Sequence, residues 1–510
     1  MTPISAAAES DALRWAALTA DCLPPRALQP QRVYALADLR YDAALNVAGE
    51  LLKADFRQVA VRFRKGAATY GELRERVMAI AARLIAVGIE PSDRVILRMT
   101  NRPELVAAWL AVQWIGAVGV HLPPMYRRRE MAHIVEDAGA RTIVCDADAA
   151  EETEALSAQS TQRLNVLVAD GHGGATEAPP PRLRDRDAPA VICYITSADG
   201  PPKGVVLSSA DVLASADTYA RHVLQLTPAD VCVGTVSLAW AYGLGGLLTF
   251  PLRASATTVL VDGAMNLLQA VADARATILF SVPTMYRMLL QHPGLSSCDL
   301  TSLRCCVSSA EPLPVPVASA WRDATGLEIV DGFGTTEMGH ICISSRPGHV
   351  REGFIGTAVP GYEARIVDDS MRDVADGTPG FLAVRGPTGA CYWRNAGEQR
   401  RTVRDGWTLT GDLCVRDPDG WFRHVRRADA LVVSAGYKIS TREVERALVE
   451  HPEVSSAHVF AEPDPVRGAV VKAVVARAGN ADGTGLSERL QQYLKTALAP
   501  FKCPREIQIV

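Results

Sequence analysis

The chain has 510 residues, more than one hydrophobic core ordinarily organises, so we expect a large body and at least one further unit. Hydrophobic residues make up 48% of it and charged residues 22%, as in soluble globular proteins, and a net charge of -4 without basic tracts argues against nucleic-acid binding. The 11 cysteines are scattered, with no CxxC pair and no histidine cluster at metal-ligand spacing, which predicts reduced thiols and a cytoplasmic location.

Two apolar stretches raise the question of a membrane segment. Residues 231–252 carry no charged side chain and are long enough to cross a bilayer, but their glycines and proline favour a buried strand, a loop and the start of a helix. Residues 1–20 are rich in alanine but carry Glu9, Asp11 and Arg14, so they lack the basic start and apolar run of a signal peptide. The sequence therefore predicts no membrane partner.

The first strand and helix in chain order lie between residues 59 and 88. Residues 59–64 alternate as a half-buried strand does, and Thr69 and Glu72 then stand three apart, as in a capping box. Gly88 is expected to end the helix that follows. The apolar residues at helical spacing in this helix are Leu73, Val77, Ile80 and Leu84.

Strands and helices continue to alternate after this unit. Residues 94–98 are expected to form a strand, Pro103 to open a helix that ends near Gly116, and residues 117–122 to form the next strand. A helix through Met131 precedes a strand at residues 142–145. This alternation indicates an α/β fold.

Two later stretches bear on domain organisation. Residues 169–189 are rich in glycine and proline and are expected to loop over the surface without regular structure. A border is expected near Asp429, because a short strand, a helix from Thr441 and further strands follow it as a compact tail. The sequence thus predicts a large domain of residues 1–428 and a small domain of residues 429–510.

Two segments have the composition of a nucleotide site. Residues 194–206, YITSADGPPKGVV, follow an apolar run and end in Lys-Gly before two valines. In residues 331–339, DGFGTTEMG, the glycines permit close backbone approach, while Thr335, Thr336 and Glu337 offer hydroxyls and a carboxylate to phosphate and magnesium. A plain turn after a strand is the alternative interpretation of the second segment.

Five more segments follow in order, and each alone is compatible with an ordinary turn. They are VRGP at 384–387, WTLTGD at 407–412, DPDGW at 417–421, RRAD at 426–429 and SAGYKIS at 434–440. Together these segments resemble the adenylate-forming superfamily. The chain looks most similar to the benzoate and 2-aminobenzoate CoA ligases of that superfamily, through LPPRALQPQRVY, LAWAYGLGGLLTFPLR, DGFGTTEMGH, VPGYEARIVDD and VRGPTGACYW, which span nearly the whole sequence.

This resemblance implies an α/β adenylate-forming fold. Its large multi-sheet N-terminal domain would bind the acyl group and the nucleotide, and its small mobile α+β C-terminal domain would swing about a hinge that Asp429 matches. In such enzymes, one orientation of the small domain serves adenylation and the other serves thioester formation. Measured against the family, the small domain of this sequence is truncated at its end.

The resemblance also implies roles for individual residues, with plain core packing as the alternative for each. Glu337 would hold magnesium if ATP is used, Thr336 a phosphate oxygen, Asp412 the ribose hydroxyls, and Arg427 the ribose or a phosphate. The nucleotide-binding set is Thr196, Ser197, Lys203, Thr335, Thr336, Glu337, Asp412 and Arg427. The acyl pocket is Ala241, Tyr242, Gly243, Ser308, Ser309, Ala310, Gly332, Phe333 and Gly334. The turn beside the coenzyme A pantetheine is Ser434, Ala435, Gly436, Tyr437 and Lys438.

The phosphate loop departs from the family pattern TSGTTGxPKG, because here it is TSADGPPKG. It is one residue shorter, Ala198 replaces a glycine, and Pro201 and Pro202 remove two amide donors. Asp199 adds a negative charge, and at about 4 Å from a phosphate charge the repulsion is roughly 1 to 4 kcal/mol. ATP binding is therefore expected to suffer.

A second departure lies at the C-terminal end. The family continues beyond a segment like PFKCPREIQIV into a loop whose lysine assists adenylation, whereas this sequence stops at Val510. Neither Lys438 nor Lys502 matches that lysine, which stabilises charge developing on the phosphate. Both departures fall on adenylation, while the segments assigned to the acyl pocket and the thiol tunnel resemble the family's.

The leading hypothesis is therefore an acyltransferase that moves an anthraniloyl or benzoyl group from aryl-CoA to the phosphopantetheine thiol of an acyl carrier protein, which resembles the anthraniloyltransferases of antibiotic pathways. A cysteine thiolate would serve as the nucleophile. The alternatives are an aryl-CoA ligase that uses ATP and magnesium, and a non-catalytic binder of aryl-CoA. The candidate nucleophiles are Cys193, Cys305, Cys306, Cys342 and Cys391.

Overall fold

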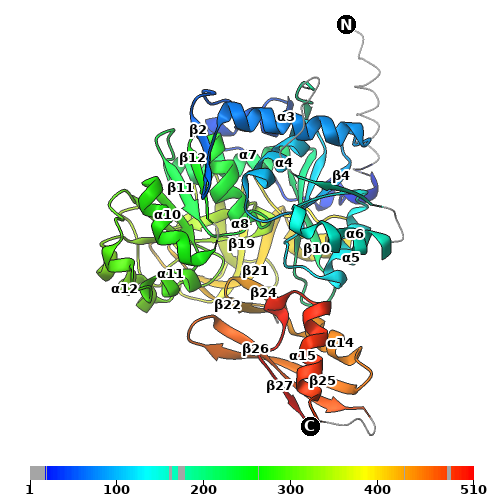
Figure 1. Ribbon diagram of the computed structural model, residues 1–510. Coiled ribbons are helices and arrows are strands. Elements are labelled where there is room, and N and C mark those ends of the chain that lie inside the picture. The colour runs from blue at the N-terminus through cyan, green and yellow to red at the C-terminus, as the bar shows by residue number, and fades with distance from the viewer. Residues whose placement is uncertain are drawn as a thin grey trace.

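A computed structural model of the protein shows a large body of several sheets with a small domain beside it (Figure 1). It describes residues 18, 20–159, 164–169, 179–261, 263–429, 431–478 and 484–510. Within these residues, none of the helices combines the length and the apolar character that a membrane crossing requires. Most of residues 1–20 lie outside the described part of the chain.

One sheet of the large body has six strands in the order β10-β9-β5-β4-β6-β7. The pairs among β9, β5, β4, β6 and β7 are parallel, and β10 folds back on β9 as an antiparallel hairpin. Residues 196–202, which form most of the predicted phosphate loop, connect the two strands of that hairpin, so their ends lie close together. The strands are β4 (Arg94–Arg98), β5 (Val118–His121), β6 (Thr142–Cys145), β7 (Asn165–Val168), β9 (Pro189–Ile195) and β10 (Lys203–Ser208).

A second sheet has nine strands in the order β17-β16-β15-β14-β13-β11-β12-β2-β3. From β2 to β15 the neighbours are parallel, so the carboxyl ends of β13, β14 and β15 meet at one edge, where ligands bind in open α/β sheets. The strands are β2 (Val59–Phe63), β3 (Gly66–Thr69), β11 (Val231–Gly234), β12 (Thr257–Leu260), β13 (Ile278–Ser281), β14 (Cys305–Ser308), β15 (Ile329–Gly334), β16 (Ile341–Ser344) and β17 (Thr357–Ala358).

Helices join the two sheets into one core. In α3 (Tyr70–Ala86) the Thr69 side chain accepts from the Glu72 amide and the Glu72 carboxylate accepts from the Thr69 amide, so the predicted capping box is confirmed. The helix α4 (Pro103–Trp114) opens on its proline, as predicted, and is buried along its length. It packs against β4 and β5 of the first sheet, and its core cluster also includes residues from strands of the second sheet.

The apolar segment 231–252 forms a strand, a loop and helices, as the sequence predicts. The strand is β11, and the helices are α8 (Ala241–Leu244), the π-helix η5 (Gly245–Thr249) and α9 (Phe250–Arg253). A Cβ on Gly243 would lie 2.1 Å from the Ser237 carbonyl oxygen, so only glycine fits at this turn. The segment is therefore part of the buried core.

The long loop predicted at residues 169–189 lies partly outside the described residues. Residues 179–183 are irregular, as predicted, but a short strand β8 (Arg184–Asp185) then pairs with β1 (Ala44–Leu45). The prediction was wrong at this point, because a partner strand more than a hundred residues earlier supplies the hydrogen bonds. Sequence pattern alone does not reveal such a partner.

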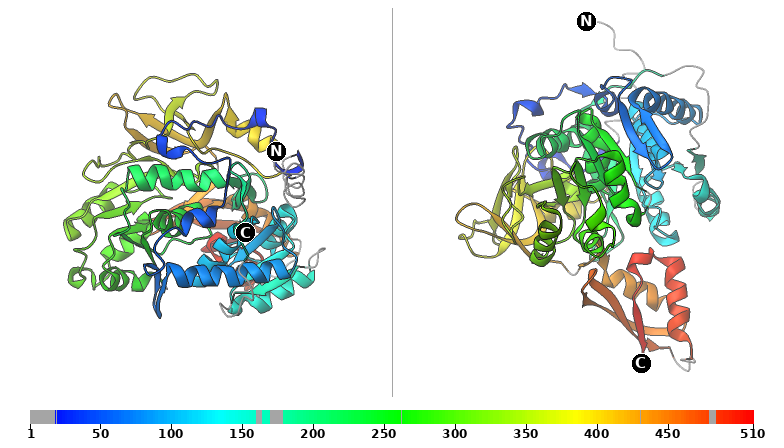
Figure 2. Two further views of the ribbon diagram at one scale, coloured as in Figure 1. Left: turned by 90° about the horizontal axis from the view of Figure 1, so that it is seen from above. Right: turned by 60° about the vertical axis from the view of Figure 1, so that its left-hand side comes forward.

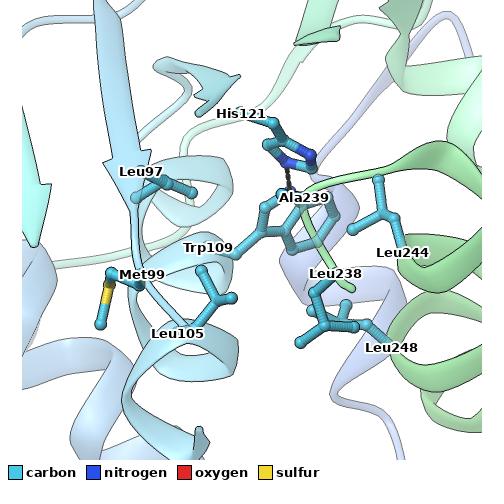
Figure 3. Close-up of a pocket in the computed structure, with 9 residues that line it drawn as sticks. All are labelled: Leu97, Met99, Leu105, Trp109, His121, Leu238, Ala239, Leu244 and Leu248. Carbon is cyan, nitrogen blue, oxygen red and sulfur yellow. Dashed lines mark hydrogen bonds between the residues drawn. The ribbon is translucent and has the colours of Figure 1, made fainter. Parts of the chain in front are cut away.

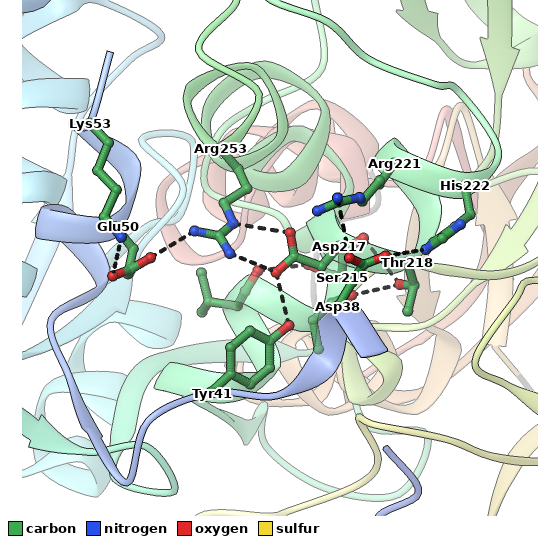
Figure 4. Close-up of polar contacts among 12 residues, drawn as sticks. Asp38, Tyr41, Glu50, Lys53, Ser215, Asp217, Thr218, Arg221, His222 and Arg253 are labelled. Carbon is green, nitrogen blue, oxygen red and sulfur yellow. Dashed lines mark hydrogen bonds and ion pairs between the residues drawn. The ribbon is translucent and has the colours of Figure 1, made fainter. Parts of the chain in front are cut away.

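A polar network ties the N-terminal part of the chain to the π-helix η4 (Ala216–Ala220) and to α9 (Figure 4). The Arg253 guanidinium donates to both oxygens of Asp217, at 3.0 Å each, and to Glu50 at 2.8 Å. The Tyr41 hydroxyl donates to the same Asp217 at 3.0 Å. Asp217 lies in η4, so the network fixes an irregular helix that packs beside the acyl region.

A third sheet completes the large body and leads to the small domain. It consists of β18 (Glu363–Val367), β19 (Gly380–Arg385), β20 (Val403–Arg404), β21 (Trp407–Arg416) and β22 (Phe422–Arg427). The small domain follows and has its own apolar core. Its elements are β23 (Leu431–Ser434), β24 (Tyr437–Ser440), α14 (Thr441–Val449), β25 (Val454–Asp464), β26 (Gly468–Arg477), α15 (Leu486–Ala497), η9 (Pro500–Lys502) and β27 (Glu506–Ile509).

The small domain therefore has the predicted order of a short strand, a helix from Thr441 and further strands. Figure 2 shows that it adjoins one end of the large body. The domain border at Asp429 remains a prediction, as does its role as a hinge.

Candidate active site

The phosphate loop between β9 and β10 is contacted by the small domain. The Thr196 hydroxyl donates to the Lys438 carbonyl oxygen at 2.9 Å, and the Ser440 hydroxyl donates to the Ala198 carbonyl oxygen at 3.0 Å. Asp199 forms an ion pair with Arg442, and its side chain is 75% exposed. This exposure and the paired cation weaken the expected repulsion of phosphate, because water and Arg442 both screen the charge.

Lys203 has a carboxylate partner at the end of the same loop. Its Nζ atom lies 2.5 Å from a Glu398 carboxylate oxygen, and Glu398 also pairs with Arg401 at 2.5 Å. Burial alone would raise the pKa of Glu398, but the hydrogen bonds from Lys203 and Arg401 lower it. Glu398 lies in α13 (Ala396–Thr402), outside every quoted motif, and sequence reasoning missed it.

The two carboxylates of the predicted nucleotide set are each held by neighbours. The Tyr392 hydroxyl donates to Glu337 at 2.7 Å. The Asp412 carboxylate lies 2.9 Å from His424 Nε2 and accepts from Arg427, also at 2.9 Å. Arg427 forms a second ion pair, with Asp429. Tyr392 and His424 lie in segments to which the sequence assigned no role.

These residues form a common electrostatic site. Thr335 and Thr336 directly precede Glu337, and Thr335 is the N-cap of the short helix η8 (Thr336–Met338), where its hydroxyl accepts from the Met338 amide at 3.3 Å. Burial lowers the pKa of Lys438, and the Arg427 charge lowers it further, while Asp412 and Glu337 oppose this. The structure thus brings Lys438 near three members of the predicted set.

A magnesium ion fits this donor set only together with a nucleotide. The described residues hold no group of three or more histidine, cysteine, aspartate or glutamate side chains that could bind a metal. Magnesium, however, is usually bound through one or two carboxylates, with phosphate oxygens and water as its remaining ligands. A half-buried carboxylate such as Glu337 is compatible with that mode.

The predicted acyl residues gather at the carboxyl ends of β13, β14 and β15. The Tyr242 hydroxyl donates to the Ser281 carbonyl oxygen at 2.9 Å, which anchors α8 to these strand ends. Ser308 and Ser309 are buried at the end of β14, and Ala310 has a φ of 72°. Ala241 and Gly243 lie in α8, while Gly332, Phe333 and Gly334 lie in β15.

His340, the last residue of the segment DGFGTTEMGH, belongs to this region as well, although the motif predicted no role for it. Its Nε2 atom lies 3.1 Å from the Tyr242 carbonyl oxygen, and its ring centroid is 4.4 Å from that of Phe250 and 5.5 Å from that of Tyr219. Burial lowers the pKa of His340 to about 3, so the imidazole is neutral. The acyl region is therefore apolar and uncharged on this side.

Three polar side chains form a row across the strand ends. Ser281 pairs in register with Ser308, and Ser308 with Asp331. All three are buried, and Oγ of each serine and Oδ1 of the aspartate have no hydrogen-bond partner of ordinary geometry among the described residues. Burial raises the pKa of Asp331 to about 8, so its carboxyl is largely protonated at neutral pH.

The predicted coenzyme A turn, residues 434–438, packs against the large domain. A Cβ on Gly436, whose φ is 82°, would lie 3.7 Å from a Glu311 oxygen and 3.8 Å from a Val282 methyl. The Tyr437 ring stacks on that of Phe501 with centroids 4.4 Å apart, and its centroid lies 6.4 Å from that of Trp240. The turn therefore occupies the boundary between the two domains.

The candidate nucleophilic cysteines are all buried free thiols. Burial raises the pKa of Cys193, Cys305, Cys342 and Cys391 to about 12, and it raises that of Cys306 as well. Because the thiolate is the nucleophilic form, these environments make poor nucleophiles at neutral pH. The structure gives no support to a cysteinyl acyl-enzyme.

A small cavity lies near the acyl region, between β4 and α4 on one side and residues 238–248 on the other (Figure 3). In its wall, Trp109 Nε1 donates to His121 Nε2 at 3.0 Å, and burial lowers the pKa of His121 to about 4. Its volume of about 10 Å³ holds at most a water molecule, which excludes an aromatic ring.

Comparison with known proteins gives a consistent family. The AMP-binding enzyme family matches residues 53–393, and the AMP-binding enzyme C-terminal domain matches residues 443–510. Benzoate--CoA ligase of Thauera aromatica is 30% identical over 92% of this chain and 93% of its own, and anthranilate--CoA ligase of Pseudomonas aeruginosa is 30% identical over 91% and 92%. The solved anthranilate CoA ligase AuaEII, in complex with anthranoyl-AMP, has a TM-score of 0.73 at 28% identity, covering 93% of this chain and 95% of that one. The chain belongs to the AMP-binding enzyme family and has its α/β adenylate-forming fold.

Proposed function

We propose that the protein is an ATP-dependent aryl-carboxylate–CoA ligase acting on an acid of the benzoate or 2-aminobenzoate class. The carboxylate oxygen would attack the α-phosphorus of ATP and expel pyrophosphate, and the CoA thiol sulfur would then attack the acyl carbon and expel AMP. The observation that carries the proposal is the joint site of Glu337, Asp412 and Arg427 beside the 434–438 turn. Ligase relatives across nearly the whole chain favour it over the acyltransferase hypothesis.

The nucleotide half of the proposal rests on fixed charges. Asp412 is buried and oriented by His424 and Arg427, so its carboxylate is preorganised to accept hydrogen bonds from vicinal hydroxyls such as those of a ribose. Magnesium held by Glu337 would neutralise charge on the polyphosphate. Tyr392 donates to Glu337 and limits the orientations of that carboxylate.

The acyl half rests on an apolar, aromatic environment. His340 is neutral, and Tyr242, Phe250 and Tyr219 surround it, so a second charged group on the acyl ring would be costly to bury there. An unsubstituted ring, or one carrying an amino or hydroxyl group, is compatible with these neighbours. We expect the reaction to take place in the cytoplasm, as the reduced cysteines suggest.

A second candidate is the transfer of an aryl group from CoA to an acyl carrier protein. The ion pair of Lys203 with Glu398 favours it, because this pairing competes with phosphate for the ammonium group. The five buried cysteines argue against an acyl-enzyme route for it. A binder of aryl-CoA without catalytic activity is the third candidate.

Pyrophosphate–ATP exchange dependent on benzoate or 2-aminobenzoate, followed by mass analysis of the CoA product, tests the proposal. Exchange and aroyl-CoA formation that disappear in Glu337→Gln are expected for a ligase. The parallel incubation contains 2-aminobenzoyl-CoA and a phosphopantetheinylated carrier protein without ATP. Carrier acylation in the absence of exchange would establish the transferase instead. Binding of aroyl-CoA without either reaction would identify the protein as a non-catalytic aryl-CoA binder.

A further inference from the structure

The two domains share a buried ion cluster at their junction. Lys502, in η9 of the small domain, places its Nζ atom 3.0 Å from an oxygen of Glu130 and 2.8 Å from an oxygen of Glu443. Glu130 belongs to α5 (Arg128–Ala138) of the large domain, whereas Glu443 belongs to α14 of the small domain. The side chains of Lys502 and Glu130 are 1% and 0% exposed. One ammonium group therefore joins carboxylates from both sides of the junction, out of contact with water.

Glu130 is bound on both of its oxygens. Its Oε1 atom accepts the Ala499 amide at 2.9 Å in addition to the Lys502 ammonium, and its Oε2 atom accepts the Arg127 amide at 3.0 Å. Two of these donors come from residues 499–502 of the small domain. A buried ion pair that loses one partner leaves an uncompensated charge, which costs about 3 to 5 kcal/mol. The contact therefore opposes displacement of the small domain from this position.

Aromatic side chains surround the ion cluster. Tyr126 and Trp240 from the large domain lie 6.0 Å apart between ring centroids, and Tyr437 and Phe501 from the small domain stack at 4.4 Å. Trp240 contacts Tyr437 edge-on at 6.4 Å, and Lys502 Nζ lies 5.4 Å from the Tyr126 centroid. The same contacts thus include Tyr437, which belongs to the coenzyme A turn.

Other ion pairs cross the junction, but they are exposed. Arg129 and Glu450 are 34% and 55% exposed, and Arg442 and Asp199 are 63% and 75% exposed. Exposed pairs of this kind contribute about 0 to 1 kcal/mol, because water screens them. Among the described residues, the cluster of Glu130, Lys502 and Glu443 is therefore the buried ionic contact across the junction.

We infer that Glu130 and Lys502 are positioning residues for the transfer of the acyl group to a thiol. They hold the small domain so that the 434–438 turn lies against Val282 and Glu311, next to the nucleotide residues. They are not among the residues proposed to touch the reacting atoms, and their effect is expected on transfer to the thiol and not on adenylation. The catalytic readout rests on the proposed ligase function, whereas the docking itself can be measured without any activity.

The catalytic test separates the two half-reactions. In Glu130→Gln, transfer from supplied aroyl-AMP to CoA in a single turnover is expected to fall at least about tenfold, because the charge partner of Lys502 is lost. Aryl-dependent pyrophosphate exchange in Glu130→Gln is expected to stay within about threefold of wild type. The matched control is Arg129→Ala, which breaks only the exposed pair with Glu450, and its transfer rate is also expected to stay within about threefold of wild type. Lys502→Arg keeps the charge and is expected to retain more transfer activity than Lys502→Met.

The docking test is hydrogen–deuterium exchange of the full-length protein. Glu130→Ala is expected to raise deuterium uptake in peptides covering residues 434–440 and 499–503, since the Ala499 amide loses its acceptor. Uptake in α15 should not change, and Arg129→Ala should leave all these peptides at the wild-type level. Unchanged uptake at 434–440 in Glu130→Ala would overturn the inference. So would an equal loss of both half-reactions in Glu130→Gln at an unchanged melting temperature.

If wild type lacks exchange and transfer activity, the proposed function fails while the docking inference is still decided by deuterium uptake. Increased deuterium uptake at residues 434–440 in Glu130→Ala would then support the docking role of Glu130 even though the ligase reaction is absent. Unchanged uptake would remove the docking role whatever the reaction is.

Discussion

The Lys203 ammonium lies 2.5 Å from the Glu398 carboxylate, at the end of the phosphate loop. Both side chains are partly buried, at 18% and 13% exposure, so solvent only partly screens the pair. The lysine expected to contact phosphate therefore has a competing partner within the protein. Variants of these two residues therefore test whether Lys203 contributes to ATP binding.

Removal of the competing carboxylate should favour ATP. Glu398→Gln is expected to lower the KM for ATP by about two- to fivefold, whereas Lys203→Met raises it by about tenfold, because a charged hydrogen bond contributes about 1.5 kcal/mol or more. Initial rates of aryl-dependent pyrophosphate release at varied ATP provide the measurement. An unchanged KM in Lys203→Met would show that this lysine does not contact the polyphosphate.

Asp199 should weaken ATP binding less than its charge alone suggests. Its side chain is exposed and paired with Arg442, so Asp199→Asn is expected to change the KM for ATP by less than about threefold. The same rate assay, repeated at low and high salt, measures the effect. A KM for ATP that is tenfold or more lower in Asp199→Asn than in wild type would support the hypothesis that Asp199 repels phosphate.

Asp331 should make stability depend on pH. Burial raises its pKa to about 8 in the folded protein, against about 3.9 for an unperturbed aspartate, so the folded state binds more protons between these values. The contribution of this group to stability is full below about pH 4 and is lost as the pH rises through about 8, by up to about 1.4 kcal/mol per pH unit.

The variant Asp331→Asn lacks this titration. Its free energy of unfolding in urea should therefore fall less steeply than that of wild type between about pH 5 and pH 8. Ser308→Ala serves as a control, because it changes the neighbouring polar side chain without removing an ionisable group. Parallel pH profiles for wild type and Asp331→Asn would contradict a raised pKa at this carboxyl.

Gly243 should tolerate no side chain. Its Cβ would meet the Ser237 carbonyl oxygen at 2.1 Å, so Gly243→Ala is expected to cost about 2 kcal/mol or more and to disturb the acyl region. The control is Gly397→Ala in α13, where the nearest atoms lie 3.7 Å away and alanine favours the helix by up to about 1 kcal/mol. Thermal unfolding of both variants measures the difference, and equal melting temperatures would contradict the predicted clash.

Local elements were the most predictable part of this fold. The capping box at Thr69 and Glu72, the proline at the start of α4 and the glycine-rich 231–252 segment each depend on neighbouring residues alone. The short strand β8 was missed because its partner β1 is distant in sequence. Periodicity also does not give strand order, which depends on how distant segments pair in space.

The site was predictable only where a residue belongs to a recognisable motif. Glu337, Asp412 and Arg427 were found in this way, and their roles remain proposals. Glu398 and His424 were missed because they contact motif residues from unmarked segments, whereas Tyr392 lies in the quoted segment VRGPTGACYW, where no role was assigned to it. Lys502 was noted in the sequence, but its partner Glu130 is 372 positions earlier in the numbering and only the fold brings the two together.

The hydrogen bond from the Thr196 hydroxyl to the Lys438 carbonyl oxygen would order the steps of the proposed reaction if Thr196 binds phosphate. A hydroxyl has one proton to donate, so Thr196 cannot give it to Lys438 and to a phosphate oxygen at the same moment. Under the proposed function, pyrophosphate has to leave before the turn settles into place, and the turn has to withdraw before the next ATP enters. Catalysis would then follow a strict alternation, in which the first product departs before the thiol substrate is engaged.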